Sequence, residues 1–183
     1  MNTVAPEKEE IIKAIKSLKN GKAPGHGNLN TELFKTDPQL TATILRPLFA
    51  AVWEGEEVPA DWTKRVVIRI PEKGALSDCN NWRGITLLSA SSKILAMVII
   101  KRISDAVNAG MRKEQARSRK ERGCTDQIFS KRYITEQCTE WQRQLYINFV
   151  DFEKTFDSIH RDSLWRILRA YGIPLRTPGL SIP

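Results

Sequence analysis

Long apolar runs are missing from this chain of 183 residues. The longest, from Ile94 to Ile100, has seven residues and is closed by a lysine at each end, whereas a membrane-spanning helix needs roughly 20. The first 15 residues contain three glutamates and no apolar stretch. The sequence therefore predicts neither a membrane contact nor a secretory signal, and an intracellular protein of the nucleus or cytoplasm is expected.

Cysteine and histidine are also scarce. The three cysteines stand at positions 79, 124 and 138 without a C-x-x-C pair, and there are two histidines. Such a composition favours reduced thiols and argues against a structural zinc site. The phosphate-loop pattern G-x-x-x-x-G-K-[ST] and the G-x-S-x-G elbow are absent from the sequence. A hydrolase with a serine or cysteine nucleophile is therefore not predicted.

Positive charge is in excess and unevenly distributed. Lysine and arginine number 29 against 21 acidic residues, for a formal net charge of +8. Residues 112–122, called the basic stretch below, hold six of the basic residues: Arg112, Lys113, Arg117, Arg119, Lys120 and Arg122. A cluster of this kind favours a nucleic-acid partner. A solvated loop that only keeps the protein soluble would have the same composition.

Hydrophobic periodicity predicts helices and strands at unequal spacing, which is typical of the α+β class. Helices are expected over residues 7–19, 39–53, 91–107, 125–142 and 162–171. Pro47 should kink or split the second of them. Runs of β-branched and aromatic residues predict strands over 65–70 and 145–152, with a polar loop after the first. The three prolines after Gly172 predict a disordered tail.

Two places in this pattern could carry chemistry. Asp151 ends the predicted 145–152 strand, where a fixed carboxylate could hold Mg²⁺ together with substrate phosphates, or could cap a turn. Lys73 and Arg83 flank the polar loop and could bind a triphosphate, or could be ordinary surface charges. Asp157 precedes the last helix and fits an N-cap.

Four segments stand out together, in sequence order. They read Lys19-Asn-Gly-Lys-Ala-Pro-Gly25, Asp78-Cys-Asn-Asn-Trp-Arg-Gly-Ile-Thr-Leu-Leu-Ser89, Gly123-Cys-Thr-Asp-Gln-Ile128 and Phe149-Val-Asp-Phe-Glu-Lys-Thr-Phe-Asp157. In this order they resemble the reverse transcriptases of non-LTR retrotransposons. The resemblance covers about residues 7–176, nearly the whole chain.

The resemblance implies part of a right-hand polymerase fold. Residues 1–142 would be helix-rich fingers, residues 143–176 the start of the palm with the first catalytic motif, and residues 177–183 a disordered tail. The implied activity is RNA-directed DNA synthesis, in which a deoxynucleotide is added to a DNA 3′-end on an RNA template. The template, the primer and the deoxynucleotide are accordingly the expected partners.

The resemblance also implies roles for single residues. Asp151 would be the first catalytic carboxylate and a Mg²⁺ ligand, and the backbone carbonyl of Phe152 would serve a second metal ion. Phe156 would lie under the sugar of the incoming deoxynucleotide and exclude a 2′-hydroxyl. Arg83 would hold the triphosphate, with Lys73 as a second candidate on the same loop.

Several positions depart from the family pattern. The family places a second palm motif and a pair of adjacent aspartates after the first motif, and this sequence contains no Asp-Asp pair. His26-Gly27-Asn28 stands where Pro-Asp-Gly is usual, Arg117-Ser118-Arg119 where Gly-Phe-Arg is usual, and Glu72 where a lysine is common. A truncated or decayed copy, inactive as a fragment, would show such departures.

Three expectations follow for the chain as it stands. It could be an inactive segment of a polymerase, a module that only binds nucleic acid through the basic stretch, or a remnant without function. An apolar strand from Leu145 to Phe152 that lacks its partner is further expected to favour self-association.

Overall fold

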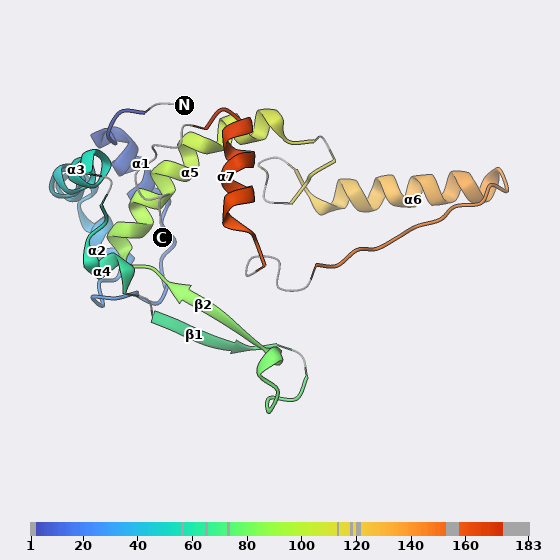
Figure 1. The fold of residues 1–183 in the computed structure, drawn as a ribbon, viewed down its shortest axis with the longest axis horizontal. Coiled ribbons are helices and arrows are strands. Elements are labelled where there is room, and N and C mark those ends of the chain that lie inside the picture. Colours follow the sequence, from blue (N-terminus) through green and yellow to red (C-terminus); the bar gives the residue numbers. More distant parts are fainter. Residues whose placement is uncertain are drawn as a thin grey trace. The chain divides into compact units, whose positions relative to one another are not determined.

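The computed structural model describes residues 3–55, 57–64, 66–72, 74–112, 114–117, 119, 122–152 and 158–173. The chain forms two compact units, one reaching to Ile103 and one comprising Ser104–Ile173. Figure 1 shows the helices and strands of both units. The described part is mostly helical with one two-stranded antiparallel sheet, so the α+β prediction holds in this coarser form.

The first unit is built from helices and a β-hairpin. In chain order they are α1 (Lys8–Ser17), α2 (Thr31–Thr36), α3 (Pro38–Gly55), α4 (Ala60–Thr63), β1 (Val66–Pro71), a 3₁₀ turn (Cys79–Asn81), β2 (Trp82–Leu87) and the first part of α5 (Ala90–Gly110). The helices predicted over 7–19, 39–53 and 91–107 correspond to α1, α3 and α5. The short helices α2 and α4 were not predicted.

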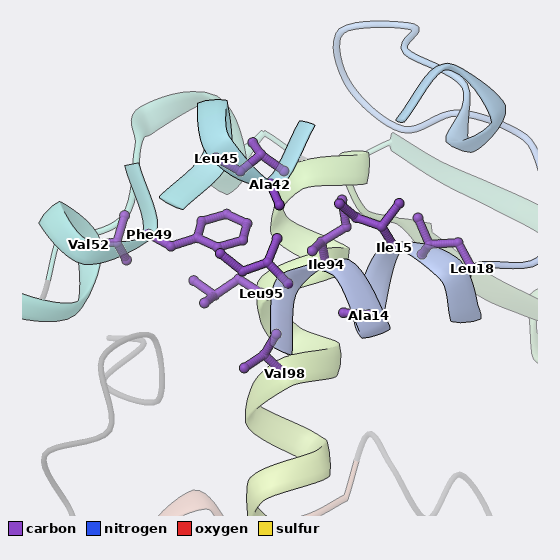
Figure 2. Packing of buried hydrophobic residues seen from close by; sticks show 11 residues of the cluster. Ala14, Ile15, Leu18, Ala42, Leu45, Phe49, Val52, Ile94, Leu95 and Val98 are labelled. Carbon is purple, nitrogen blue, oxygen red and sulfur yellow. The ribbon is translucent and has the colours of Figure 1, made fainter. Parts of the chain in front are cut away.

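A single apolar cluster joins α1, α3 and α5 (Figure 2). Ile11 and Ile15 from α1, Phe49 from α3 and Ile94 from α5 are completely buried at its centre. Full burial of one such side chain stabilises the fold by about 1.5–3 kcal/mol. The 3.6-residue period of these helices therefore defines the core of the first unit.

Pro47 does not split α3, which runs from Pro38 to Gly55. Of the two predicted outcomes, a kink or a split, the split is therefore wrong, and the kink stays a prediction. Pro47 lies on the exposed side of the helix. The opposite side of α3 is buried through Ala42, Leu45 and Phe49, and this packing holds the helix together.

The β-hairpin confirms the strand predicted over 65–70 and adds one that was not predicted. β1 and β2 pair antiparallel, with Ile68 opposite Ile85 and Ile70 opposite Arg83. Every residue of β1 is exposed, so backbone pairing rather than burial forms this sheet. The tip is ordered by the Asp78 carboxylate, which accepts a hydrogen bond from the Asn80 N–H at 2.8 Å.

The second unit contains the end of α5, α6 (Cys124–Glu140) and α7 (Arg161–Ala170). These helices match the predictions over 125–142 and 162–171. Gly110 at the end of α5 lies against the Tyr171 ring, so closely that a Cβ at Gly110 would overlap it. No residue of α6 is buried.

The prediction of a strand over residues 145–152 was wrong. Residues 143–152 form neither helix nor strand and continue from the turn after α6 as an extended trace (Figure 1). A strand needs a hydrogen-bonded partner, and the described residues offer it none. The predicted tail after Gly172 lies outside the described residues from position 174 onward. In the part of the chain that is described, no helix is long and apolar enough to cross a membrane.

Candidate functional site

Asp151 lies in the exposed segment that follows α6. Its side chain and that of Phe152 are both exposed, the latter residue by 73%. Phe156 and Asp157 fall outside the described residues, so the predicted sugar contact and N-cap are not placed. The rigid strand that was expected to fix the Asp151 carboxylate is absent from the described part of the chain.

Asp151 and Phe152 carry the oxygen atoms that could bind a Mg²⁺ ion. A carboxylate at Asp151 and a backbone carbonyl at Phe152 are hard oxygen ligands of the kind that Mg²⁺ prefers. However, among the described residues no three His, Cys, Asp or Glu side chains gather in a group that could hold a metal. One exposed carboxylate does not make such a site, so the described residues do not fit a Mg²⁺ ion by themselves.

Arg83 lies on the β-hairpin, at the end remote from α5. Its guanidinium forms an ion pair with Glu72, with Nη2 and Oε1 2.7 Å apart. Both side chains are well exposed, at 71% and 43%. Glu72 is the position at which the resemblance leads us to expect a lysine. An anionic ligand of Arg83 must compete with a carboxylate of the same hairpin.

Two lysines that sequence reasoning did not single out as ligands lie near the other end of the hairpin. Lys22 and Lys93 line a groove of about 400 Å³ whose other walls include Ile68, Ile70 and Ile85. Lys22 belongs to the first segment of the resemblance, and Lys93 comes four positions after the second. This proximity was the available signal. The candidate Lys73 lies outside the described residues.

The loop before α2 meets the end of β2 at Gly25. A Cβ at this position would overlap the backbone of Leu88 and Ser89. The structure thereby brings together two segments of the resemblance, Lys19–Gly25 and Asp78–Ser89, that are more than fifty residues apart in the chain.

His26 lies in this same loop. Its Nε2 lies 3.6 Å from the carboxylate of Asp61, and its side chain is 39% exposed. Lys64 also contacts that carboxylate, with Nζ at 2.6 Å. The hydrogen bond and charge of Lys64 lower the pKa of Asp61 below its usual value. His26 thus belongs to an exposed polar cluster.

The basic stretch lies in the second unit, where its residues differ in their surroundings. Arg112 is 90% exposed, with Nε 3.6 Å from a Glu114 carboxylate oxygen. Arg117 and Arg122 are exposed as well. Arg119 instead directs its guanidinium at three main-chain carbonyls, those of Arg112, Gln115 and Asn108. Lys113 and Lys120 lie outside the described residues.

Comparison with known proteins identifies relatives of this chain. Residues 70–179, more than half of the chain, match the family described as "Reverse transcriptase (RNA-dependent DNA polymerase)". The chain is 30% identical over 169 residues to the "Retrovirus-related Pol polyprotein from type-1 retrotransposable element R2" of Popillia japonica. It is 25% identical over 163 residues to the "Transposon TX1 uncharacterized 149 kDa protein" of Xenopus laevis. It is also 25% identical over 159 residues to the "Probable RNA-directed DNA polymerase from transposon BS" of Drosophila melanogaster.

These matches cover most of this chain and little of the relatives. They include 91%, 89% and 85% of the chain, respectively, but only 22%, 12% and 18% of the three relatives. The chain therefore spans less than a quarter of the length of each of these relatives.

Proposed function

Because this chain belongs to the reverse transcriptase (RNA-dependent DNA polymerase) family and is related to the enzymes of non-LTR retrotransposons, we propose that it supplies the fingers and the first part of the palm to an RNA-directed DNA polymerase. The single observation that carries this proposal is the match over residues 70–179, which includes the Arg83 hairpin and the Asp151 segment. In this assignment, residues 1–142 are fingers and residues 143–176 begin the palm of a right-hand fold.

The proposed reaction is attack of a primer 3′-oxygen on the α-phosphorus of a deoxynucleotide, with pyrophosphate as the leaving group. Fixed positive charge near the leaving phosphates lowers the barrier of such a transfer. Arg83 is the proposed clamp on the triphosphate, with Lys73 as a second candidate, and Phe156 is the proposed contact to the sugar. Because Glu72 is 2.7 Å from Arg83, the triphosphate would have to displace this carboxylate.

Asp151 is proposed as the first metal-binding carboxylate, with the Phe152 carbonyl as a neighbouring ligand. Mg²⁺ is the ion this donor chemistry would take. The described residues supply only one such carboxylate, so we derive no catalytic step from it. The consequence is that residues 1–183, tested as a separate polypeptide, should not catalyse nucleotidyl transfer.

Primer extension tests the proposal directly. The purified chain should not extend a DNA primer on an RNA template with Mg²⁺ or Mn²⁺, because one carboxylate cannot hold two metal ions in place. Extension that disappears in an Asp151→Asn variant would contradict this and would mean that the chain completes its own site.

The role of Asp151 is tested by grafting. The aligned segment of the Popillia japonica relative is replaced by this chain, and extension by the chimaera is compared with that of its Asp151→Asn variant. The proposal requires that extension by an active chimaera be lost in the variant. Asp126→Asn, at an exposed position of α6, is the matched control and should leave extension unchanged. If Asp151→Asn is as active as its control, the assignment of Asp151 is wrong.

A second function is favoured by one specific observation, the exposure of Arg112 and Arg117. The chain would then act as a binding module for nucleic acid without catalysis, gripping the phosphate backbone with little regard to sequence. Each phosphate that it neutralises should steepen the log–log salt dependence by about 0.7 for a single strand. Binding that does not respond to salt would argue against this role and leave a remnant without function.

A further inference from the structure

Arg119 makes contacts unlike those of its basic neighbours. Its Nη1 donates to the carbonyl oxygens of Arg112 at 2.9 Å and Gln115 at 3.3 Å. Its Nη2 donates to the carbonyl oxygen of Asn108 at 3.3 Å. All three acceptors are backbone atoms that precede Arg119 in the chain. The guanidinium therefore ties Arg112 and Gln115, which follow α5, to Asn108 at the end of that helix.

The acceptor on α5 is one that needs a partner. Asn108 lies in the last turn of α5, which ends at Gly110, and the last four carbonyls of a helix have no intrahelical donor. The carbonyl of Val107 is satisfied by the N–H of Met111 at 3.0 Å, and that of Asn108 is satisfied by Arg119. A positive charge is also favourable at this end of a helix, since it opposes the helix dipole.

Burial separates Arg119 from the residues beside it. Arg119 is partly buried and Ala116 is 7% exposed. Arg112 and Arg117, by contrast, point to solvent, with the Arg112 side chain 90% exposed. If Arg119 turned outward to bind a phosphate, it would give up three hydrogen bonds and leave the Asn108 carbonyl without its donor.

We propose that Arg119 is a positioning residue: it folds the loop after α5 from within, and among the described basic residues of the stretch the phosphate contacts are left to the outward Arg112, Arg117 and Arg122. The second half of this proposal rests on the proposed nucleic-acid function, whereas the first half concerns the loop alone. A loop that is already folded pays less ordering entropy when its arginines bind a ligand. Arg119 thereby contributes to affinity without touching the nucleic acid.

The chemistry requires arginine at this position. A guanidinium is a rigid planar fork whose two terminal nitrogens can serve acceptors on different stretches of backbone. A lysine carries the same charge on a single nitrogen and cannot span the three carbonyls. Arg119→Lys therefore separates the two possible roles, because it keeps the charge and removes the fork.

The experiment compares the 183-residue chain with its Arg119→Lys, Arg119→Ala and Arg117→Ala variants. Hydrogen exchange of residues 111–117 is measured without nucleic acid, with the amides of α6 as an internal reference. Arg119→Lys and Arg119→Ala should both accelerate exchange in the loop by roughly tenfold or more, which corresponds to losing one charge-assisted hydrogen bond. Arg117→Ala should leave exchange in the loop unchanged.

Binding of a fluorescein-labelled single-stranded RNA is then titrated at several salt concentrations. Arg117→Ala should lower the log–log slope by about 0.7, the loss of one phosphate contact. Arg119→Lys should weaken binding by a similar factor at every salt concentration and keep the slope, because the contacts to phosphate remain and only their ordering is lost.

The outcomes are distinct. If Arg119→Lys preserves both loop exchange and RNA affinity, or if the loop of the unchanged protein exchanges as fast as an unfolded chain, the proposal is overturned. If the unchanged protein does not bind RNA, the nucleic-acid function fails, and the exchange data still decide whether Arg119 folds the loop.

Discussion

Arg102 forms the most buried ion pair of the first unit that the structure describes. Its side chain is 5% exposed, and its partner Glu10 on α1 is 30% exposed. Nε donates to one oxygen of the Glu10 carboxylate at 2.8 Å and Nη2 donates to the other, so the contact is bidentate. Nη1 donates to the carbonyl of Val4 at 2.6 Å, and the guanidinium carbon lies 5.1 Å from the centre of the Trp53 ring.

We predict that Arg102→Met destabilises the first unit severely. Methionine keeps the apolar stem against Trp53 but removes the charge and the hydrogen bonds of Arg102. The partly buried Glu10 carboxylate then loses its bidentate partner and keeps the hydrogen bond from the Glu7 N–H at 3.0 Å. Breaking a buried pair from one side costs about 3–5 kcal/mol. Because the Glu10 side chain is 30% exposed, we expect a loss of stability at the lower end of that range, about 3 kcal/mol. The free energy of unfolding of a domain is only about 5–15 kcal/mol, so the predicted loss is a large share of the total stability.

Urea unfolding followed by tryptophan fluorescence measures the effect. With a slope of about 1–3 kcal/mol per molar, a loss of about 3 kcal/mol should lower the urea midpoint by roughly 1–3 M. Lys64→Met, which breaks the exposed pair with Asp61 in the same unit, is the matched control and should leave the midpoint unchanged, since exposed pairs contribute little. Combining Arg102→Met with Glu10→Gln should cost less than the sum of the two single changes.

The pH dependence gives a second readout. The hydrogen bond from Arg102 is the main cause that lowers the pKa of Glu10 from its ordinary value of 4.5. A carboxyl with a lowered folded-state pKa stabilises the protein above its unfolded-state value, and this contribution is lost as the pH falls through the folded-state pKa. Stability of the unchanged protein should therefore decline below about pH 5, and this part of the decline should be absent in Arg102→Met. An unaltered midpoint, or an unaltered acid profile, would refute the reasoning.

Two further predictions concern backbone packing. Gly25→Ala should destabilise the first unit by about 1–3 kcal/mol, because its Cβ would overlap the backbone of Leu88, whereas Gly55→Ala, which meets no atom, should be neutral in urea unfolding. The segment 145–152 forms no strand and exposes apolar side chains such as Phe149 and Phe152. It should therefore exchange its amides much faster than residues 91–107 and should drive association of the 183-residue chain, measured by hydrogen exchange and light scattering. A stable monomer in which the two segments exchange equally slowly would contradict the second prediction.

Sequence patterns predicted those elements whose formation depends on local periodicity. The spacing of Ile11, Ala14, Ile15 and Leu18 predicted α1, and all four residues are buried. The same reasoning found α5, α6 and α7, since an amphipathic helix satisfies its own backbone. Periodicity could not predict that α6 has no buried residue, because it identifies the apolar face of a helix but not the segment that packs against this face.

Elements that depend on pairing were predicted less well, because a strand is completed only by another segment. The 145–152 run has strong β-propensity and yet forms no strand in the described structure. β2 contains Gly84, a residue type that is disfavoured in strands, and it forms here because β1 lies beside it. The Arg102–Glu10 pair joins residues 92 positions apart, and no spacing rule reaches that far.

For the candidate site, too, the sequence indicated which residues to consider but not which contacts they make. The motifs named Asp151 and Arg83, but they could not show that Arg83 is already paired with Glu72. The six basic residues between 112 and 122 formed one cluster in the sequence, whereas the structure gives Arg119 backbone partners and leaves Arg112 and Arg117 in solvent. Charge alone could not separate these cases, because a guanidinium bound to carbonyls and one free to bind phosphate have the same sequence signature. Because the Arg119 guanidinium is already bound to carbonyls, the number of phosphates that the stretch can neutralise is smaller than its number of charges by at least one, and the salt slope of the unchanged protein should reflect this.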